Sequence, residues 1–181
     1  MQYIAHCDSP LGGITLASNG EALTGLWFDG QKHFGSTLGE HPSSSADLPV
    51  FEETRRWLDV YFMKNEDSPD APTHSSFFTL HSSFPPTPPL SLRGTTFLQR
   101  VWKELLSIPY GQTVTYGELA RRLGCRSAQA VGGAVGRNPI SIIIPCHRVV
   151  GANGSLTGYA AGLDRKRTLL ALEIQKNIGI K

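Results

Sequence analysis

The chain has 181 residues, of which 40% are hydrophobic and 18% charged, and its formal net charge is +2. This length and composition are typical of one or two folded domains with a real hydrophobic core. No stretch approaches the ~20 consecutive apolar residues of a membrane-spanning helix, and residues 1–19 lack the pattern of a secretion signal. We therefore expect a cytoplasmic protein with no membrane partner.

The cysteines and histidines form no recognisable disulfide or metal pattern. Cys7, Cys125 and Cys146 are an odd number without CxxC spacing, which argues against a disulfide framework and a four-thiolate zinc site. The five histidines before residue 90 show no ligand spacing with Cys7. We expect free thiols, no metal and no other cofactor.

Charge is distributed unevenly along the chain. Residues 1–90 hold 4 Lys/Arg against 11 Asp/Glu, a net charge of −7, whereas residues 91–181 hold 13 against 4, a net charge of +9. A basic half suggests contact with a polyanion such as nucleic acid. A chance imbalance between two solvated surfaces also explains these numbers, so charge alone assigns no partner.

The N-terminal third predicts a small sheet with one helix. Residues 2–8, 14–18 and 22–29 alternate in polarity between turn signals, which indicates a three-stranded antiparallel meander. In residues 50–62 the apolar side chains recur every three or four positions, as in an amphipathic helix that packs on a sheet. We assign residues 1–63 to an N-terminal α/β domain.

Residues 64–92 interrupt this pattern. They hold six of the twelve prolines and show no sustained periodicity, which is typical of a linker. We therefore place a second, mainly helical domain at residues 93–181.

Three helices are predicted at the start of the second domain. Residues 95–108 have the helical period, with Trp102 expected in the core. Residues 116–123 and 127–137 follow, and the short turn between them gives helix-turn-helix spacing.

The second helix of this pair is unusually rich in small residues. Residues 128–136 read AQAVGGAVG, although glycine costs ~1 kcal/mol relative to alanine inside a helix. Small side chains permit close approach either of another helix or of a ligand such as a nucleic-acid groove, and both explanations stay open here. Nearby arginines either meet phosphates or form an ordinary solvated surface: Arg121, Arg122, Arg126 and Arg137.

A candidate nucleophile follows these helices. The β-branched run 141–144 predicts a buried strand that ends at Pro145, so Cys146 lies where strand becomes turn. A lone cysteine in such a place is most often a packing residue. His147 and Arg148 change that balance, because a thiol of pKa ~8.5 needs a nearby base or positive charge to act as a nucleophile.

On an extended segment, His147 does not reach Cys146 directly. Neighbouring side chains of a strand point to opposite faces, so the imidazole would act on the thiol through a water molecule. Such a base needs a carboxylate to orient it, and Glu173 is the only acidic residue after Asp164.

Several ordered motifs match one known family. They are PCHRV at 145–149, YGELA at 116–120, AVGGA at 130–134, NPI at 138–140, Gly158-Tyr159, Gly162-Leu163 with Lys166, Leu169-Leu170 and Glu173, and DSPLG at 8–12. Together they resemble the O6-alkylguanine-DNA alkyltransferase family, strongly over residues 94–173.

The resemblance implies a fold and a reaction. The fold is an α/β N-terminal domain with a three-stranded antiparallel sheet and a helix, followed by a mainly helical domain with a winged-helix-like helix-turn-helix motif. The reaction is DNA repair by irreversible, single-turnover transfer of the alkyl group of O6-alkylguanine, and of O4-alkylthymine, to a cysteine. The implied partner is double-stranded DNA, bound by a monomer through the minor groove with little sequence specificity. The target base must flip out of the stack to reach a buried thiol.

The resemblance also implies roles for individual residues. Cys146 would accept the alkyl group, His147 would take its proton through a water, and Glu173 would orient His147. Tyr116 would assist at the phosphate or the purine, and Asn138 would brace the turn before the site.

Further residues match positions that contact the substrate or DNA. The backbone groups of Cys146, Val149 and Ala160 match positions that touch the base, and Tyr159 lies in the same segment. Gln129 stands where many relatives carry an intercalating arginine, and we expect it to fill the space of the flipped base. The full set expected at DNA is Arg126, Ala128, Gln129, Gly132, Arg137 and Arg148.

Two other functions fit parts of the sequence. A damage sensor that binds alkylated guanine without repairing it would resemble this family but lack the acceptor cysteine. A regulator that reads the major groove would carry long polar side chains on its second helix, where this chain has mostly Ala and Gly.

Overall fold

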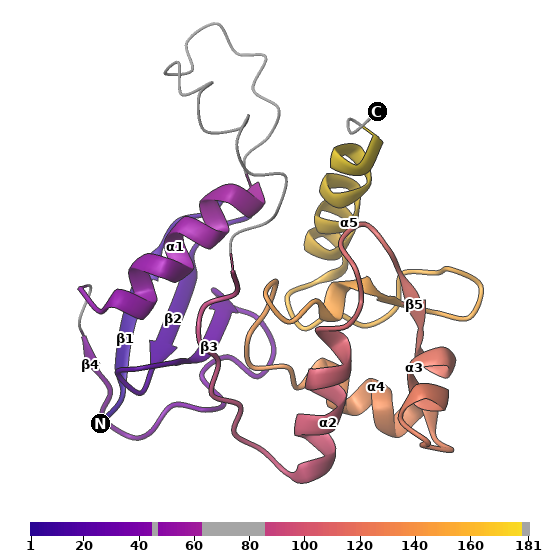
Figure 1. Ribbon diagram of the computed structural model, residues 1–181, viewed down its shortest axis with the longest axis horizontal. Helices are drawn as coiled ribbons and strands as arrows, with labels where there is room; N and C mark the ends of the chain where they lie inside the picture. Colours follow the sequence, from indigo (N-terminus) through magenta and orange to yellow (C-terminus); the bar gives the residue numbers. More distant parts are fainter. Residues whose placement is uncertain (45–46, 63–85, 179–181) are drawn as a thin grey trace, which may run out of the picture.

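A computed structural model describes residues 1–44, 47–62 and 86–178 of the chain. The N-terminal part is a sheet covered by one long helix, and the C-terminal part is a group of helices beside it (Figure 1). Within the described residues, no helix is long and apolar enough to cross a membrane.

The predicted meander is confirmed. Strands β1 (Tyr3–Cys7), β2 (Ile14–Ser18) and β3 (Leu23–Phe28) pair in antiparallel fashion. A fourth strand, β4 (Ser43–Ser44), adds in parallel to the edge of β1, which gives the order β3-β2-β1-β4. Its two residues are too few to show a period of two, so the sequence did not reveal it.

The predicted N-terminal helix is also confirmed, as α1 (Pro49–Phe62). Proline fits the first turn because its missing N–H would have no partner there. Helix α1 lies over the sheet (Figure 1), and its apolar residues Phe51 and Tyr61 are fully buried. The rings of Trp57 and Tyr61 are stacked, with centroids 5.4 Å apart.

The C-terminal part contains the three predicted helices and one more. The predicted ones are α2 (Thr96–Leu105), α3 (Tyr116–Arg122) and α4 (Ala128–Gly136), and α5 (Leu163–Ile178) follows. Each of the first three begins after a Ser or Thr whose side chain accepts a first-turn backbone N–H. Trp102 is a core residue, as expected, and its indole N–H donates to the Ala134 carbonyl of α4 at 2.9 Å.

The strand predicted at residues 141–144 is wrong. These residues form a tight turn in which Ile142 has φ of +68° and Ile144 N donates to Ile140 O at 3.1 Å. All four residues are buried, so the sequence predicted their burial correctly but not their backbone conformation. Short apolar runs do not distinguish a strand from other buried backbone.

Part of the segment predicted as a linker lies among the described residues. Residues 63–85 lie outside the described part of the chain, and residues 89–91 bond to the first residue of β3. Leu23 N donates to Pro89 O at 2.7 Å, and Ser91 N donates to Leu23 O at 2.9 Å. This stretch therefore pairs with the sheet at its β3 edge.

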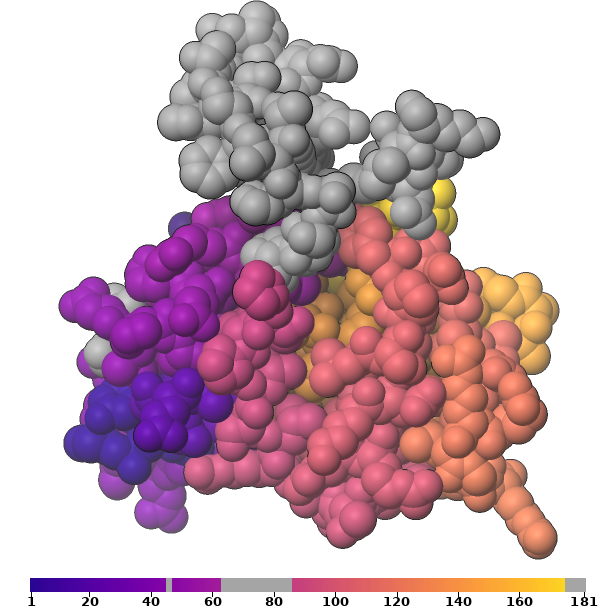
Figure 2. Space-filling view, in the orientation of Figure 1, coloured from indigo at the N-terminus to yellow at the C-terminus, as the bar shows by residue number. Residues whose placement is uncertain are grey.

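Strand β3 also connects the sheet to the C-terminal part. Leu26 N donates to Pro139 O at 2.9 Å, and Ser141 N donates to Leu26 O at 2.8 Å. The two halves lie side by side (Figure 2) and contribute to one continuous hydrophobic core. The domain limits expected from the sequence stay predictions.

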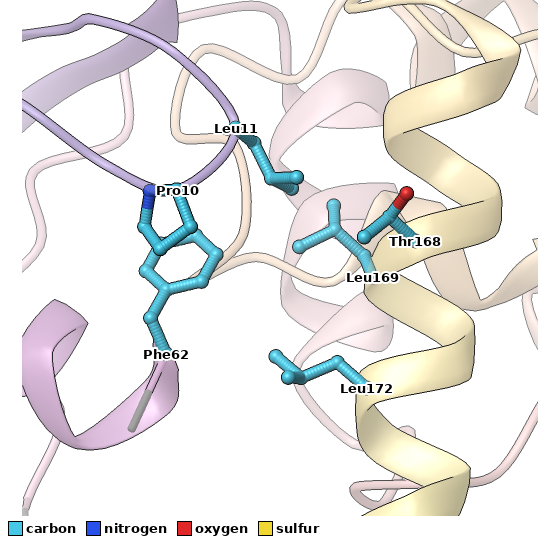
Figure 3. A pocket seen from close by; sticks show the side chains of 6 residues that line it. All are labelled: Pro10, Leu11, Phe62, Thr168, Leu169 and Leu172. Atoms are coloured by element: carbon cyan, nitrogen blue, oxygen red, sulfur yellow. The ribbon is translucent and has the colours of Figure 1, made fainter. Parts of the chain in front are cut away.

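A small apolar hollow of about 130 Å³ lies where the two halves meet. Figure 3 shows the loop after β1, the end of α1 and one side of α5 around it. Its lining residues are Pro10, Leu11, Phe62, Thr168, Leu169 and Leu172. None of the residues predicted to carry the chemistry lines it.

Candidate active site

The candidate nucleophile lies at the start of a short 3₁₀ helix, Cys146–Arg148, directly before β6 (Val149–Val150). Cys146 is 4% exposed. Because the segment is a 3₁₀ turn rather than a strand, the expected alternation of Cys146 and His147 across two faces does not apply. Strand β6 pairs in parallel with β5 (Val114–Thr115), which fixes the far end of this turn.

Asn138 ties the residues around the thiol together. Its side-chain amide donates to Ile140 O at 3.1 Å, to Ile144 O at 2.8 Å and to Cys146 Sγ at 3.1 Å. Its side-chain oxygen accepts from Ile140 N at 3.0 Å. The buried amide therefore holds the 140–144 turn closed and presents an N–H to the sulfur.

His147 and Glu173 form a buried pair. His147 Nε2 lies 2.7 Å from Glu173 Oε1, and both side chains are fully buried. With Nε2 facing a carboxylate, the proton of the neutral ring belongs on Nε2 and the free lone pair on Nδ1. Within the described residues, Nδ1 has no hydrogen-bond partner. Nδ1 is therefore the atom available to accept a proton.

Arg148 differs from the expectation that it contacts DNA. Its Nε and Nη2 donate to the two oxygens of Glu173 at 2.9 and 3.0 Å, and Nη1 donates to Ile108 O at 2.6 Å. The residue is only 8% exposed. Its donors are used inside the protein, so we remove Arg148 from the set of DNA-contacting residues.

The environment sets the charge of each group. Burial by itself raises the pKa of Glu173, but the hydrogen bonds from His147 and Arg148, with the charge of the guanidinium, outweigh it and hold the pKa at about 2. Burial lowers the pKa of His147 despite Glu173, so the ring is neutral near pH 7. Burial also raises the pKa of the Cys146 thiol, although Asn138 and Lys166 act in the opposite direction. The resting site thus contains a neutral thiol, a neutral imidazole and a carboxylate.

Tyr116 and Lys166 fix the segment before α5. The Tyr116 hydroxyl donates to Thr157 O at 3.2 Å and Gly158 O at 3.3 Å. The ammonium group of Lys166, which is fully buried, donates to Thr157 O at 2.8 Å and to Val149 O at 2.6 Å. The segment that carries Tyr159 and Ala160 is thereby joined to β6 and α3.

The N-terminal half holds the same segment from the other side. Lys32 N donates to Ala160 O at 2.9 Å, which engages one of the backbone groups expected to contact the base. Gln31 is buried next to Lys32, and its side-chain oxygen accepts from Ser141 Oγ at 3.1 Å.

Sequence reasoning missed Tyr61 as a site residue. Its hydroxyl donates to Glu173 Oε1 at 2.7 Å and lies 3.3 Å from His147 Nε2. In the sequence Tyr61 is one apolar position of an amphipathic helix, 112 residues from Glu173. Lys166 was noticed only as part of a motif, because a helical lysine gives no signal that its ammonium group is buried.

Helix α4 exposes the residues expected at DNA. Arg126, Ala128, Gln129 and Arg137 are exposed, and Gly132 is half-buried against the Tyr116 ring. An added Cβ at Gly133 or Gly136 would meet nothing within 4 Å. Close packing of another helix therefore does not explain these two glycines, because no other part of the described chain lies against them.

No metal site is found among residues 1–44, 47–62 and 86–178, where no three His, Cys, Asp or Glu side chains are placed to share an ion. His74 and His81 lie outside the described residues.

Comparison with known proteins covers both halves of the chain. The family model for the ribonuclease-like domain of 6-O-methylguanine DNA methyltransferase matches residues 2–73, and the model for its DNA binding domain matches residues 96–175. A methylated-DNA-protein-cysteine methyltransferase of Mycobacterium leprae is 44% identical, with 93% of this chain and 92% of the relative covered. One from Methanosarcina acetivorans is 42% identical, with 94% and 97% covered.

A solved structure is also similar to this chain over nearly its whole length. The crystal structure of Mycobacterium tuberculosis OGT in complex with DNA superposes with a TM-score of 0.75 at 41% identity, with 96% of this chain and 94% of that chain covered.

Proposed function

Because this chain belongs to the 6-O-methylguanine DNA methyltransferase family, we propose that it repairs DNA by direct alkyl transfer to Cys146. The substrate is O6-alkylguanine, and also O4-alkylthymine, in double-stranded DNA. The acceptor is not regenerated, so each molecule acts once.

One observation carries the proposal for the site: the buried Cys146 thiol accepts a hydrogen bond from Asn138 at 3.1 Å, and the next residue, His147, pairs with Glu173 of α5 at 2.7 Å. A neutral thiol is a poor nucleophile, so a base must take its proton. His147 is neutral and its Nδ1 is unpaired among the described residues, which suits that task. Glu173 then stabilises the imidazolium ion that forms.

The transfer itself needs no further reagent. Cys146 Sγ attacks the alkyl carbon, a C–S bond forms, and the bond between that carbon and guanine O6 breaks. The electron pair stays on guanine, which takes up the proton that the thiol released. Tyr116, whose hydroxyl lies beside the 157–158 carbonyls, is our candidate donor to the purine as negative charge develops.

DNA binding is assigned to the exposed surface of α4. Its bare glycines and alanines allow the backbone to enter the minor groove, and Arg126 and Arg137 supply charge for phosphates. A thiol that is 4% exposed cannot reach a stacked base, so the base must flip into the protein. Gln129 then takes the place of the flipped base. Few donors on α4 imply little sequence specificity.

The sensor function is not favoured, because the acceptor cysteine is present with a base and a carboxylate beside it. A monomeric state, a cytoplasmic location and the winged-helix likeness stay predictions.

The test is intact mass after incubation with a duplex that carries one O6-methylguanine. We expect one added methyl group per molecule, which peptide mapping places on Cys146. Cys146→Ser should gain no mass, and Cys125→Ser, which removes a half-buried thiol on the turn between α3 and α4, should react like the wild type. Damage-dependent binding without a change of mass would reject repair in favour of sensing.

A further inference from the structure

We propose that Tyr61, on the N-terminal helix α1, is a positioning residue for alkyl transfer, which it assists by fixing the carboxylate of Glu173 and the ring of His147. This inference rests on the proposed function above. It gives the N-terminal half a direct part in the chemistry, because Tyr61 contacts the His147–Glu173 pair itself.

The contacts of Tyr61 are specific. Its hydroxyl donates to Glu173 Oε1 at 2.7 Å, the same oxygen that His147 Nε2 contacts at 2.7 Å. The phenol oxygen lies 3.3 Å from His147 Nε2, and the two rings meet edge to face with centroids 6.5 Å apart. Tyr61 is fully buried, and its stacking on Trp57 fixes its ring from behind.

The hydrogen-bond directions follow from these distances. The carboxylate can only accept, so the Tyr61 proton points at Oε1 and the phenol oxygen turns a lone pair toward Nε2. The Nε2 proton of His147 then faces two acceptors, Glu173 Oε1 and the Tyr61 oxygen. This favours the tautomer with Nδ1 unprotonated, which is the form that can take the proton of Cys146.

Tyr61 is one of several groups that donate a hydrogen bond to Glu173. Arg148 donates to both carboxylate oxygens, and Gly111 N donates to Oε2 at 3.0 Å. Loss of the Tyr61 hydroxyl would leave Oε1 with one donor fewer and free the carboxylate to turn. The imidazole would then lose part of its orientation.

The same loss acts on the pKa of His147 in two ways. Glu173 loses a donor, which strengthens its attraction for a protonated ring, and the protonated ring loses the phenol oxygen that accepts from Nε2. The charged and titratable groups around the ring, which stay in place, are Cys146, Arg148, Tyr159, Lys166 and Glu173.

The experiment compares Tyr61→Phe with wild type in single-turnover methyl transfer from an O6-methylguanine duplex, followed by intact mass between pH 5 and 9. Phenylalanine keeps the ring stack and removes only the hydroxyl. The matched control is Tyr3→Phe, which removes a phenol hydroxyl on β1 that bonds only to Met1 Sδ among the described residues. Duplex affinity is measured on the Cys146→Ser background with and without Tyr61→Phe.

We expect Tyr61→Phe to react about tenfold more slowly at pH 8, as is typical when a partner that orients a reactive group is removed. The acid limb of its pH-rate profile should move, because a protonated His147 cannot accept a proton and both lost contacts of Tyr61 set the pKa of that ring. Duplex affinity should not change, and Tyr3→Phe should match the wild type. A profile that keeps its acid limb, or a rate equal to wild type, would overturn the positioning role, including where thermal stability falls. A wild type that gains no methyl group would instead refute the proposed function.

Discussion

Tyr116 and Lys166 donate hydrogen bonds to the same two backbone carbonyls, those of Thr157 and Gly158. One donor comes from the first residue of α3, next to the surface of α4, and the other from α5. The segment that carries Tyr159 and Ala160 is therefore held between a helix assigned to DNA and a helix that supplies Glu173. The position of this segment should therefore shift when either Tyr116 or Lys166 is replaced.

Replacement of Lys166 tests how far this segment depends on one buried cation. Lys166→Met keeps the length of the side chain but removes the ammonium donor to the carbonyls of Val149, Thr157 and Gly158, of which the last two also accept from Tyr116. An unsatisfied buried acceptor costs ~1–3 kcal/mol, so we expect the melting temperature to fall by about 5 °C or more. Calorimetry measures this, with the exposed Lys103→Met as the control. A melting temperature equal to wild type would show that the segment is held without Lys166.

Replacement of Gln129 tests its role at the flipped base. We expect Gln129→Ala to lower the repair rate on duplex DNA about tenfold, which corresponds to ~1.4 kcal/mol of lost contact. The reaction with free O6-methylguanine should not change, because no stack has to be filled. Gln112→Ala, at an exposed glutamine after α2, is the control. An unchanged rate on duplex DNA would make Gln129 an ordinary solvated residue.

We predict that Arg148 contributes to the stability of the fold, whereas Arg137 contributes to DNA binding. Arg148→Lys loses the two-point contact with Glu173 and should lower thermal stability, since an ammonium group cannot replace the planar fork of a guanidinium. Arg137→Gln, at an exposed position after α4, should leave stability unchanged and weaken DNA binding.

Salt titrations separate the two effects. If Arg137 contacts a phosphate, Arg137→Gln should reduce the slope of log affinity against log salt by about one. A reduced slope in Arg148→Lys, measured where that variant is folded, would return Arg148 to the DNA surface.

Two glutamates with the same low pKa should affect stability differently. The pKa of Glu173 and that of Glu118 both lie at about 2, but Glu173 is buried whereas Glu118 pairs with Arg121 and Arg122 in solvent. A carboxyl whose pKa falls on folding stabilises the protein above the unfolded value of about 4.3, and this stability is lost as pH falls toward 2.

Urea unfolding of the wild type should therefore show decreasing free energy from pH 5 to 2. Glu173→Gln should have a flatter acid profile and lower stability at pH 7, whereas Glu118→Gln should resemble the wild type, because exposed pairs contribute little and salt screens them. A steep acid profile that survives Glu173→Gln would assign this pH dependence to other groups.

The sequence by itself determined the elements with a clear period. The meander, α1 and the three helices from α2 to α4 follow from local alternation or helical spacing, which depends on neighbours in the chain. Burial of residues 141–144 could also be read from their apolar side chains. The motifs around Cys146 indicated the family, because several ordered residues agree at once.

Only the tertiary structure decided the rest, because it depends on contacts between distant residues. The turn at Ile142 arises from the bonds of Asn138, which no periodicity records. Arg148 was expected at DNA and Lys166 stood only as part of a motif, and their burial depends on a carboxylate or carbonyl groups that other segments bring to them. Tyr61 looked like a core aromatic, and its hydroxyl meets Glu173 only because α1 and α5 pack in one core. A hydrogen bond across 112 residues leaves no pattern in the sequence on either side of it.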